Sequence, residues 1–171
     1  DVLCLGVALT HGFGRIGCFS SGCCYGKATD AFWGVSFPPG SIAQFTMVQS
    51  GLIHPSQGTP HLHPTQLLSS ALTFALGLAL YLWWKRTRPQ AGMVVAAYLA
   101  VYPSVRFVVG LLRGDPEREF LFRWPEADPY LLSTTQTGAL VLVPLALALM
   151  WALKSGRLNP KKERPLSSVG A

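Results

Sequence analysis

Long apolar blocks, rather than short periodic segments, dominate the pattern of hydrophobic and polar positions along the chain. Three blocks, residues 66–84, 92–112 and 130–153, reach the roughly 20 apolar residues that a membrane-spanning helix needs. A fourth block, residues 1–14, is too short to span alone and predicts part of a further span. The pattern predicts an all-α fold, a polytopic integral membrane helix bundle.

Two segments before the first long block have a different character. Residues 11–26, HGFGRIGCFSSGCCYG, are rich in glycine and cysteine. Within them, residues 15–26 predict a re-entrant or broken segment, because irregular backbone at membrane depth persists only against protein or a water-lined cavity. Residues 27–64 combine repeated prolines with few apolar runs, and they predict an outer-face arm with a short amphipathic helix at 41–50.

Composition and charge placement support the membrane assignment. Only 13% of the residues are charged, whereas soluble domains carry about a quarter. Basic residues gather in the link 85–91 and in the tail 154–171, while the loop 113–129 is mainly acidic. The positive-inside rule therefore places the link and the C-terminus in the cytoplasm and the arm outside. The net charge of +6 lies beside anionic membrane lipids, so no nucleic-acid partner is expected.

Domain organisation follows from the same pattern. Residues 1–153 form one membrane domain, and the basic tail 154–171 is expected to be disordered. The chain starts at Asp1 with no basic n-region, so the first block is not expected to be a signal peptide. We expect these residues to be the later part of a longer membrane protein.

Three arginines are predicted at similar depth near the outer surface. An arginine inside a span, such as Arg106, costs roughly 2.5–3.5 kcal/mol at the helix centre. Arg113 follows two helical turns later on the same face, and Arg15 lies in the glycine-rich segment. Guanidinium groups match phosphate oxygens, so the three indicate a phospholipid headgroup site. The alternative is that they pair with Asp115, Glu117 or interfacial lipid.

The cysteines and histidines leave several hypotheses open. Cys18, Cys23 and Cys24 have no standard zinc spacing, which favours packing or a disulfide over a metal site with His11. His11, four residues before Arg15, is either a proton acceptor or a hydrogen-bonded bundle histidine. His63 suits a structural role at a helix start. Tyr25 either packs or extends its hydroxyl toward a headgroup.

Several motifs together resemble the prolipoprotein diacylglyceryl transferase family. GRIGCFSSGCCYG is similar to that family's Gly-Arg-hydrophobic-Gly-Asn-Phe signature, and WGVSFP, HPTQL and the Arg106-Phe107 pair follow in the family's order. Asp1 and Gln136 also fall at family positions. The residues that fit the signature itself are Gly14, Arg15, Gly17, Phe19, Gly22 and Gly26.

The resemblance implies a bacterial inner-membrane enzyme that needs no cofactor or metal ion. Its substrates would be phosphatidylglycerol and the lipobox cysteine of a prolipoprotein signal peptide, with diacylglyceryl transferred to sulfur and glycerol phosphate released. Arg15 and Arg106 would grip the phosphate, and His11 is the candidate base, since the family's His-Gly-Gly segment is not in these residues. The expected substrate-binding residues are Arg15, Cys18, Gly22, Tyr25, Gly26, His63, Gln66, Arg106, Arg113 and Gln136.

Departures from the family pattern keep other functions open. Cys18 replaces the signature Asn, Cys23 and Gly110 stand at usual Glu positions, and Leu68-Ser69 replaces Tyr-Glu. These changes predict a divergent branch. The alternatives are a non-catalytic lipid- or peptide-binding membrane subunit and a thiol-redox or metal-binding membrane protein.

Overall fold

The computed structural model describes residues 1–114, 120–124 and 131–155. This part of the chain contains five helices and one antiparallel two-stranded hairpin. The elements are α1 (Val2–Ser21), α2 (Ile42–Gln49), α3 (Thr65–Thr87), α4 (Met93–Leu111), β1 (Phe120–Trp124), β2 (Leu131–Ser133) and α5 (Thr134–Lys154). By length and composition, α1, α3, α4 and α5 are each able to cross a membrane.

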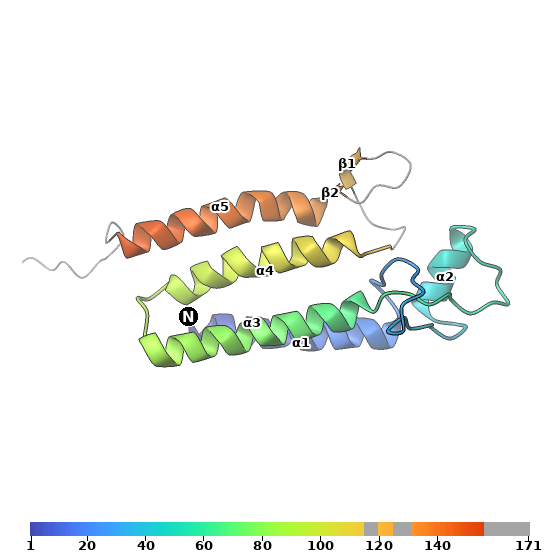
Figure 1. The fold of residues 1–171 in the computed structure, drawn as a ribbon, viewed down its shortest axis with the longest axis horizontal. Helices are drawn as coiled ribbons and strands as arrows, with labels where there is room; N and C mark the ends of the chain where they lie inside the picture. Colours follow the sequence, from blue (N-terminus) through green and yellow to red (C-terminus); the bar gives the residue numbers. More distant parts are fainter. Residues whose placement is uncertain (115–119, 125–130, 156–171) are drawn as a thin grey trace, which may run out of the picture.

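The four long helices lie side by side and alternate in direction (Figure 1). α1 packs on α3, α3 on α4, and α4 on α5. At one end, here called the link end, lie Asp1, the connection between α3 and α4, and the end of α5. At the other, the arm end, lie α2 and the loops around it. The connection between α3 and α4 and the end of α5 therefore lie at the opposite end of the bundle from the arm, as the charge pattern predicts.

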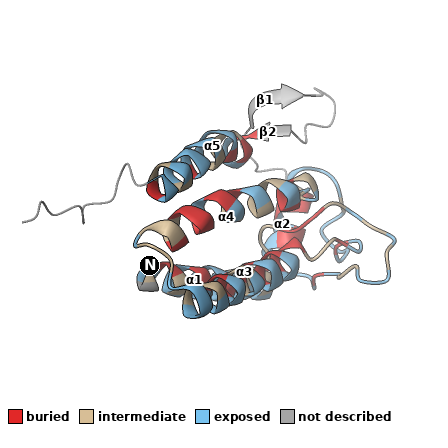
Figure 2. Ribbon diagram, turned by 60° about the vertical axis from the view of Figure 1, so that its left-hand side comes forward, coloured by how far each residue is buried: buried red, intermediate tan, exposed pale blue. Residues whose placement is uncertain are grey.

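Buried residues lie where the helices face one another, and residues on the outer faces remain exposed (Figure 2). Cys4, Ala8, Leu80, Val94, Ala97 and Tyr98 form the core between α1, α3 and α4. Large apolar side chains such as Leu78, Leu140 and Leu145 point outward and are more than half exposed. Exposed apolar surface of this extent is typical of helices that face lipid or other membrane segments.

The predicted break after residue 14 was wrong. α1 is a continuous helix to Ser21 and ends on Gly22, whose φ of 72° is left-handed. One of its glycines, Gly12, serves close packing instead: a Cβ there would overlap the Phe74 ring, and Ser70 on α3 donates to the Gly12 carbonyl at 2.9 Å. Small residues of this kind let membrane helices approach closely.

The last span begins later than its hydropathy predicts. Ser133 caps α5 and forms a capping box with Gln136, while residues 131–133 pair as a strand with β1. Neither strand was predicted, because composition alone cannot distinguish a short apolar strand from the start of an apolar helix. Tyr130 lies outside the described residues, as does the tail from residue 156 that was expected to be disordered. The predicted short helix in the arm is confirmed as α2, which Ser41 caps.

Asp1 ties the start of α1 to the start of α4. Gly92 precedes α4 in a left-handed conformation and supplies no side-chain cap. The Asp1 carboxylate accepts hydrogen bonds from the Gly92 N–H at 3.1 Å and the Val95 N–H at 3.4 Å. A carboxylate at a helix N-terminus satisfies free N–H groups and complements the helix dipole. The contact fixes the relative height of the two helices that carry Arg15 and Arg106.

Three segments are joined by backbone hydrogen bonds at the arm end, and we call this arrangement the clasp. Gly26 N donates to His63 O at 2.9 Å, and His63 N donates to Lys27 O at 3.0 Å. On the other side, Lys27 N donates to Leu112 O at 2.9 Å, and Gly26 bridges Arg113. The clasp thus joins the glycine-rich stretch, the HPTQL segment and the end of α4.

Gly26→Ala tests the clasp. A Cβ at Gly26 would lie 2.5 Å from the His63 Cβ and 2.7 Å from the His63 carbonyl oxygen. Because backbone cannot move aside cheaply, we expect the full-length protein to lose about 1–3 kcal/mol of stability, measured by thermal unfolding in detergent. Gly6→Ala is the control, since nothing lies within 4 Å of its Cβ position. Equal melting temperatures for the two variants would contradict the role of the clasp.

Candidate functional site

Arg15 on α1 and Arg106 on α4 line the same narrow crevice. Ser69 and Thr73 of α3 form its third wall, and the remaining lining residues are Tyr102, Val105 and Val109. The Arg106 guanidinium is also close enough to those of Arg15 and Arg113 for their charges to interact. The structure therefore brings together the three arginines that the sequence placed at similar depth.

Arg15 and Arg106 form no salt bridge within the part of the chain that the structure describes. The carboxylates available there are Asp1 and Asp30; Asp1 caps α4 at the link end, and Asp30 lies exposed in the arm. The alternative partners, Asp115 and Glu117, fall outside the described residues. Like charges held together in partly buried surroundings repel one another, which favours an anion beside them. The crevice has a volume of only about 10 Å³, so its side chains have to move apart before a phosphate fits between them.

His11 lies one helical turn before Arg15 and is held by two tyrosines of α4. Its Nδ1 is 2.8 Å from the Tyr98 hydroxyl, and its ring stacks on Tyr102 with 4.9 Å between centroids. When Nδ1–H donates to the hydroxyl, Nε2 retains its lone pair and is able to accept a proton. The geometry thus provides an oriented histidine on an exposed part of α1.

Cys18, Cys23 and Cys24 lie together at the end of α1, and all three are free thiols. Their sulfur atoms all lie within 4.8 Å of one another. Burial, together with the neighbouring Cys18 and Cys24, raises the pKa of the Cys23 thiol to about 12. Cys23 is therefore a neutral thiol at physiological pH, and its S–H points toward the Cys18 carbonyl oxygen, 3.6 Å from the sulfur.

Gln66 and Gln136 are fully buried polar residues, 1% and 0% exposed. Gln66 Nε2 donates to the Cys23 carbonyl at 2.7 Å, and the neighbouring Thr65 donates to the Cys24 carbonyl at 2.9 Å. Gln66 Oε1 and Gln136 Nε2 have no hydrogen-bond partner within the described residues. Such buried polar atoms are rare and indicate a water molecule or ligand group.

The other predicted binding residues lie in the scaffold around the crevice. Gly22 ends α1, and Gly26 belongs to the clasp. Tyr25 is 2% exposed and bonds the Thr46 hydroxyl at 2.9 Å, which favours the packing alternative. His63 Nδ1 accepts from the Trp33 indole N–H at 3.1 Å, and both residues line a cavity of about 460 Å³.

Sequence reasoning missed the two tyrosines and the hydroxyl wall of the crevice. Tyr98 and Tyr102 precede Arg106 at intervals of four residues, so all three share one face of α4. Ser69 and Thr73 are likewise four residues apart on α3. These spacings were present in the sequence and would have identified both walls.

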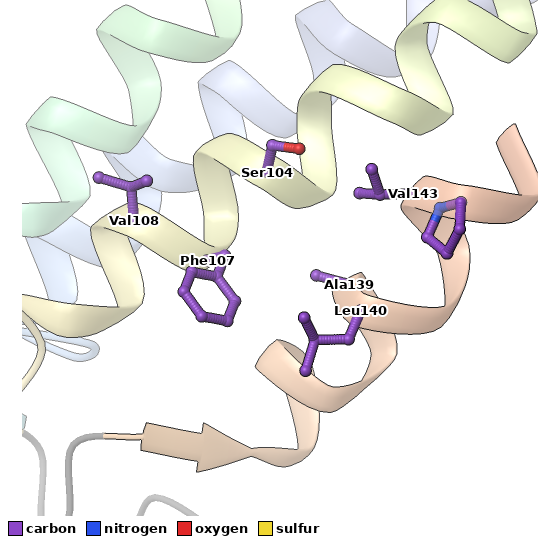
Figure 3. A pocket seen from close by; sticks show the side chains of 7 residues that line it. Ser104, Phe107, Val108, Ala139, Leu140 and Val143 are labelled. Carbon is purple, nitrogen blue, oxygen red and sulfur yellow. The ribbon is translucent and has the colours of Figure 1, made fainter. Parts of the chain in front are cut away.

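An apolar groove runs between α4 and α5 (Figure 3). Phe107, Ala139, Leu140 and Val143 project into it from the two helices. Its volume is about 330 Å³, and the remaining lining residues are Ser104, Val108 and Pro144. Phe107 directly follows Arg106, so the groove and the crevice lie at the same height of α4.

Comparison with known proteins gives a consistent result. A family model described as prolipoprotein diacylglyceryl transferase matches residues 1–153. A Clostridium perfringens protein named phosphatidylglycerol–prolipoprotein diacylglyceryl transferase 2 is 41% identical over 116 residues, 68% of this chain and 40% of that protein. A transferase from Paramagnetospirillum magneticum is 35% identical over 161 residues, 91% of this chain and 51% of that protein. No solved structure gives a significant match.

The family match extends over α1, α3, α4 and most of α5, and it includes every site residue described above. The chain spans about 40% of the length of the first curated relatives it matches, from Clostridium perfringens and Clostridium tetani. The resemblance seen in the sequence motifs is confirmed. This multi-pass membrane chain belongs to the prolipoprotein diacylglyceryl transferase family.

Proposed function

We propose that this chain carries the headgroup site of an enzyme that transfers diacylglyceryl from phosphatidylglycerol to the lipobox cysteine of prolipoproteins. The observation that carries the proposal is the pair Arg15 and Arg106, which share a crevice without a carboxylate partner in the described residues. Both substrates occur in the names of the relatives. The enzyme acts in the bacterial inner membrane, with the arm end outside and the C-terminus in the cytoplasm.

The two guanidinium groups suit the charge change of this reaction. The substrate thiolate attacks a glycerol carbon, a C–S bond forms, and the C–O bond to the phosphate breaks. The electron pair moves to the departing phosphate oxygen, so negative charge grows on glycerol phosphate. Arg15 and Arg106 bind the phosphate before the reaction and stabilise this added charge during it.

In this proposal, His11 removes the proton from the substrate thiol. The thiolate is the nucleophile, and a free cysteine with a pKa of about 8.5 is mostly protonated at neutral pH. Tyr98 holds one ring nitrogen at 2.8 Å, which orients the other as a base. His11 lies on the same face of α1 as Arg15, so the base and the phosphate grip share one site.

The groove between α4 and α5 is suited to an acyl chain. Its walls are almost entirely aliphatic or aromatic (Figure 3). Phe107, one of its lining residues, directly follows Arg106 on α4. A lipid whose phosphate is held at Arg106 would have its acyl chains within reach of this groove. Burial of a chain there contributes binding energy of about 0.8 kcal/mol per methylene group.

Replacing the arginines tests the proposal. In the full-length enzyme, Arg15→Ala and Arg106→Ala should each lower transfer to a lipobox peptide about 100-fold or more, because a stabilising donor is lost. Mass spectrometry of the thioether product measures this. Arg86→Ala, an exposed arginine near the link end of α3, is the matched control and should retain activity. Full activity in both site variants would exclude the proposal, and lipid binding without thioether formation by the unaltered enzyme would indicate a non-catalytic subunit.

Replacing His11 tests the base. His11→Gln should lower kcat about 100-fold or more at neutral pH with little change in KM. The deficit should shrink as the pH approaches about 8.5, since the substrate thiol then ionises without help. Tyr98→Phe should show a smaller loss of the same kind, and the exposed His54→Gln serves as the control. A pH-independent deficit would mean that His11 has only a structural role.

Filling the groove tests the acyl-chain path. Val143→Trp would occupy much of the space between α4 and α5, so KM for phosphatidylglycerol should rise about tenfold, equivalent to about 1.4 kcal/mol. Val141→Trp is the matched control, because Val141 is 55% exposed and does not line the groove. Equal KM values for the two variants would show that acyl chains bind elsewhere.

A further inference from the structure

We propose that Cys18, Cys23 and Cys24 form a three-thiolate site for a soft monovalent cation, Cu⁺. The proposal concerns a group of side chains to which the proposed transfer mechanism assigns no step. It rests on the positions of three sulfur atoms, on the way the fold holds them, and on the charge beside them. It is independent of the proposed transferase activity.

The sulfur geometry fits one small ion. The three sulfur atoms lie within 4.8 Å of one another. Three thiolates that bind one ion at about 2.3 Å would lie about 4 Å apart. Side-chain rotation alone is therefore sufficient to close the site.

Coordination number favours Cu⁺ over Zn²⁺. Structural zinc sites have four ligands in tetrahedral geometry. The three cysteines form a group that no histidine, aspartate or glutamate joins among the described residues. Soft thiolate ligands select both Cu⁺ and Zn²⁺, but three sulfur ligands complete the coordination of Cu⁺, whereas Zn²⁺ would need a water as its fourth ligand.

The fold holds the three thiols in place independently of any ion. Cys18 lies in the last turn of α1, and the left-handed Gly22 turns the chain back so that Cys23 N donates to Cys18 O at 3.1 Å. The buried side chain of Gln66 holds the Cys23 carbonyl, and Thr65 holds that of Cys24. Cys24 has a φ of 59°, which is uncommon for a residue other than glycine and is found at ligand clamps.

Electrostatics also favour a metal thiolate here. Cu⁺ bound by three thiolates carries net negative charge, because each thiol releases its proton to water as its metal–sulfur bond forms. Cys24 lies close enough to Arg106 for their charges to interact. The guanidinium offsets the negative charge that would otherwise be costly at this partly buried position.

The experiment is a competition titration. The full-length protein, purified without oxygen, is titrated with Cu⁺ in the presence of a coloured Cu⁺ chelator. We expect one ion more per chain than in the triple variant Cys18→Ser/Cys23→Ser/Cys24→Ser, and at least about a tenfold loss of affinity in each single variant. Cys4→Ser is the matched control, because Cys4 lies buried near the opposite end of α1.

A measurement on the unchanged protein guards against misfolded variants. Cu⁺ should protect Cys18, Cys23 and Cys24 together from alkylation, as read by mass spectrometry of their peptide. Equal copper binding by the unchanged protein and the triple variant would overturn the proposal. Two further outcomes would also overturn it: a stable disulfide between two of the three cysteines after purification without oxygen, or binding of Zn²⁺ in preference to Cu⁺.

Discussion

Two guanidinium groups that have no carboxylate partner among the described residues are the constraint on which the rest of this structure depends. Removing a charge from water costs several kcal/mol even after relaxation, and two like charges nearby add repulsion. Arg15 and Arg106 nevertheless line one crevice between α1, α3 and α4. The fold tolerates this because the crevice lies near the arm end of the helices, where water and lipid headgroups are within reach of long side chains. An anion bound there would stabilise the arrangement as well as serve the reaction.

Contacts at both ends of the bundle hold that crevice. At the link end, Asp1 caps α4 and sets the height of α1 against α4. At the arm end, the clasp joins Gly26 to His63 and to the end of α4. Segments far apart in the sequence are therefore fixed relative to one another by backbone groups, whose positions are less variable than those of side chains. Two arginines on different helices need such support to present a shared phosphate site.

The sequence predicted the spanning helices and the gathering of arginines because both follow from strong constraints. Hydrocarbon thickness sets helix length, and burial of charge restricts where Arg106 can lie. Local outcomes were harder to predict. The glycines of α1 indicated a broken segment, but Gly12 makes room for Phe74, and this depends on a partner helix. The capping role of Asp1 depends on Gly92, ninety-one residues away, so no local pattern reveals it.

The charge state of the three cysteines affects the electrostatic environment of the arginine pair. Cys18, Cys23 and Gly110 stand at positions where the family resemblance leads us to expect polar or carboxylate side chains. Neutral thiols leave the positive charge of Arg15 and Arg106 uncompensated, whereas a metal-bound thiolate cluster would compensate part of it. When the thiols are neutral, the arginines attract a lipid phosphate strongly. When a metal thiolate cluster lies beside them, its negative charge weakens that attraction. The thiol group is thus placed where its chemical state would alter the affinity of the headgroup site.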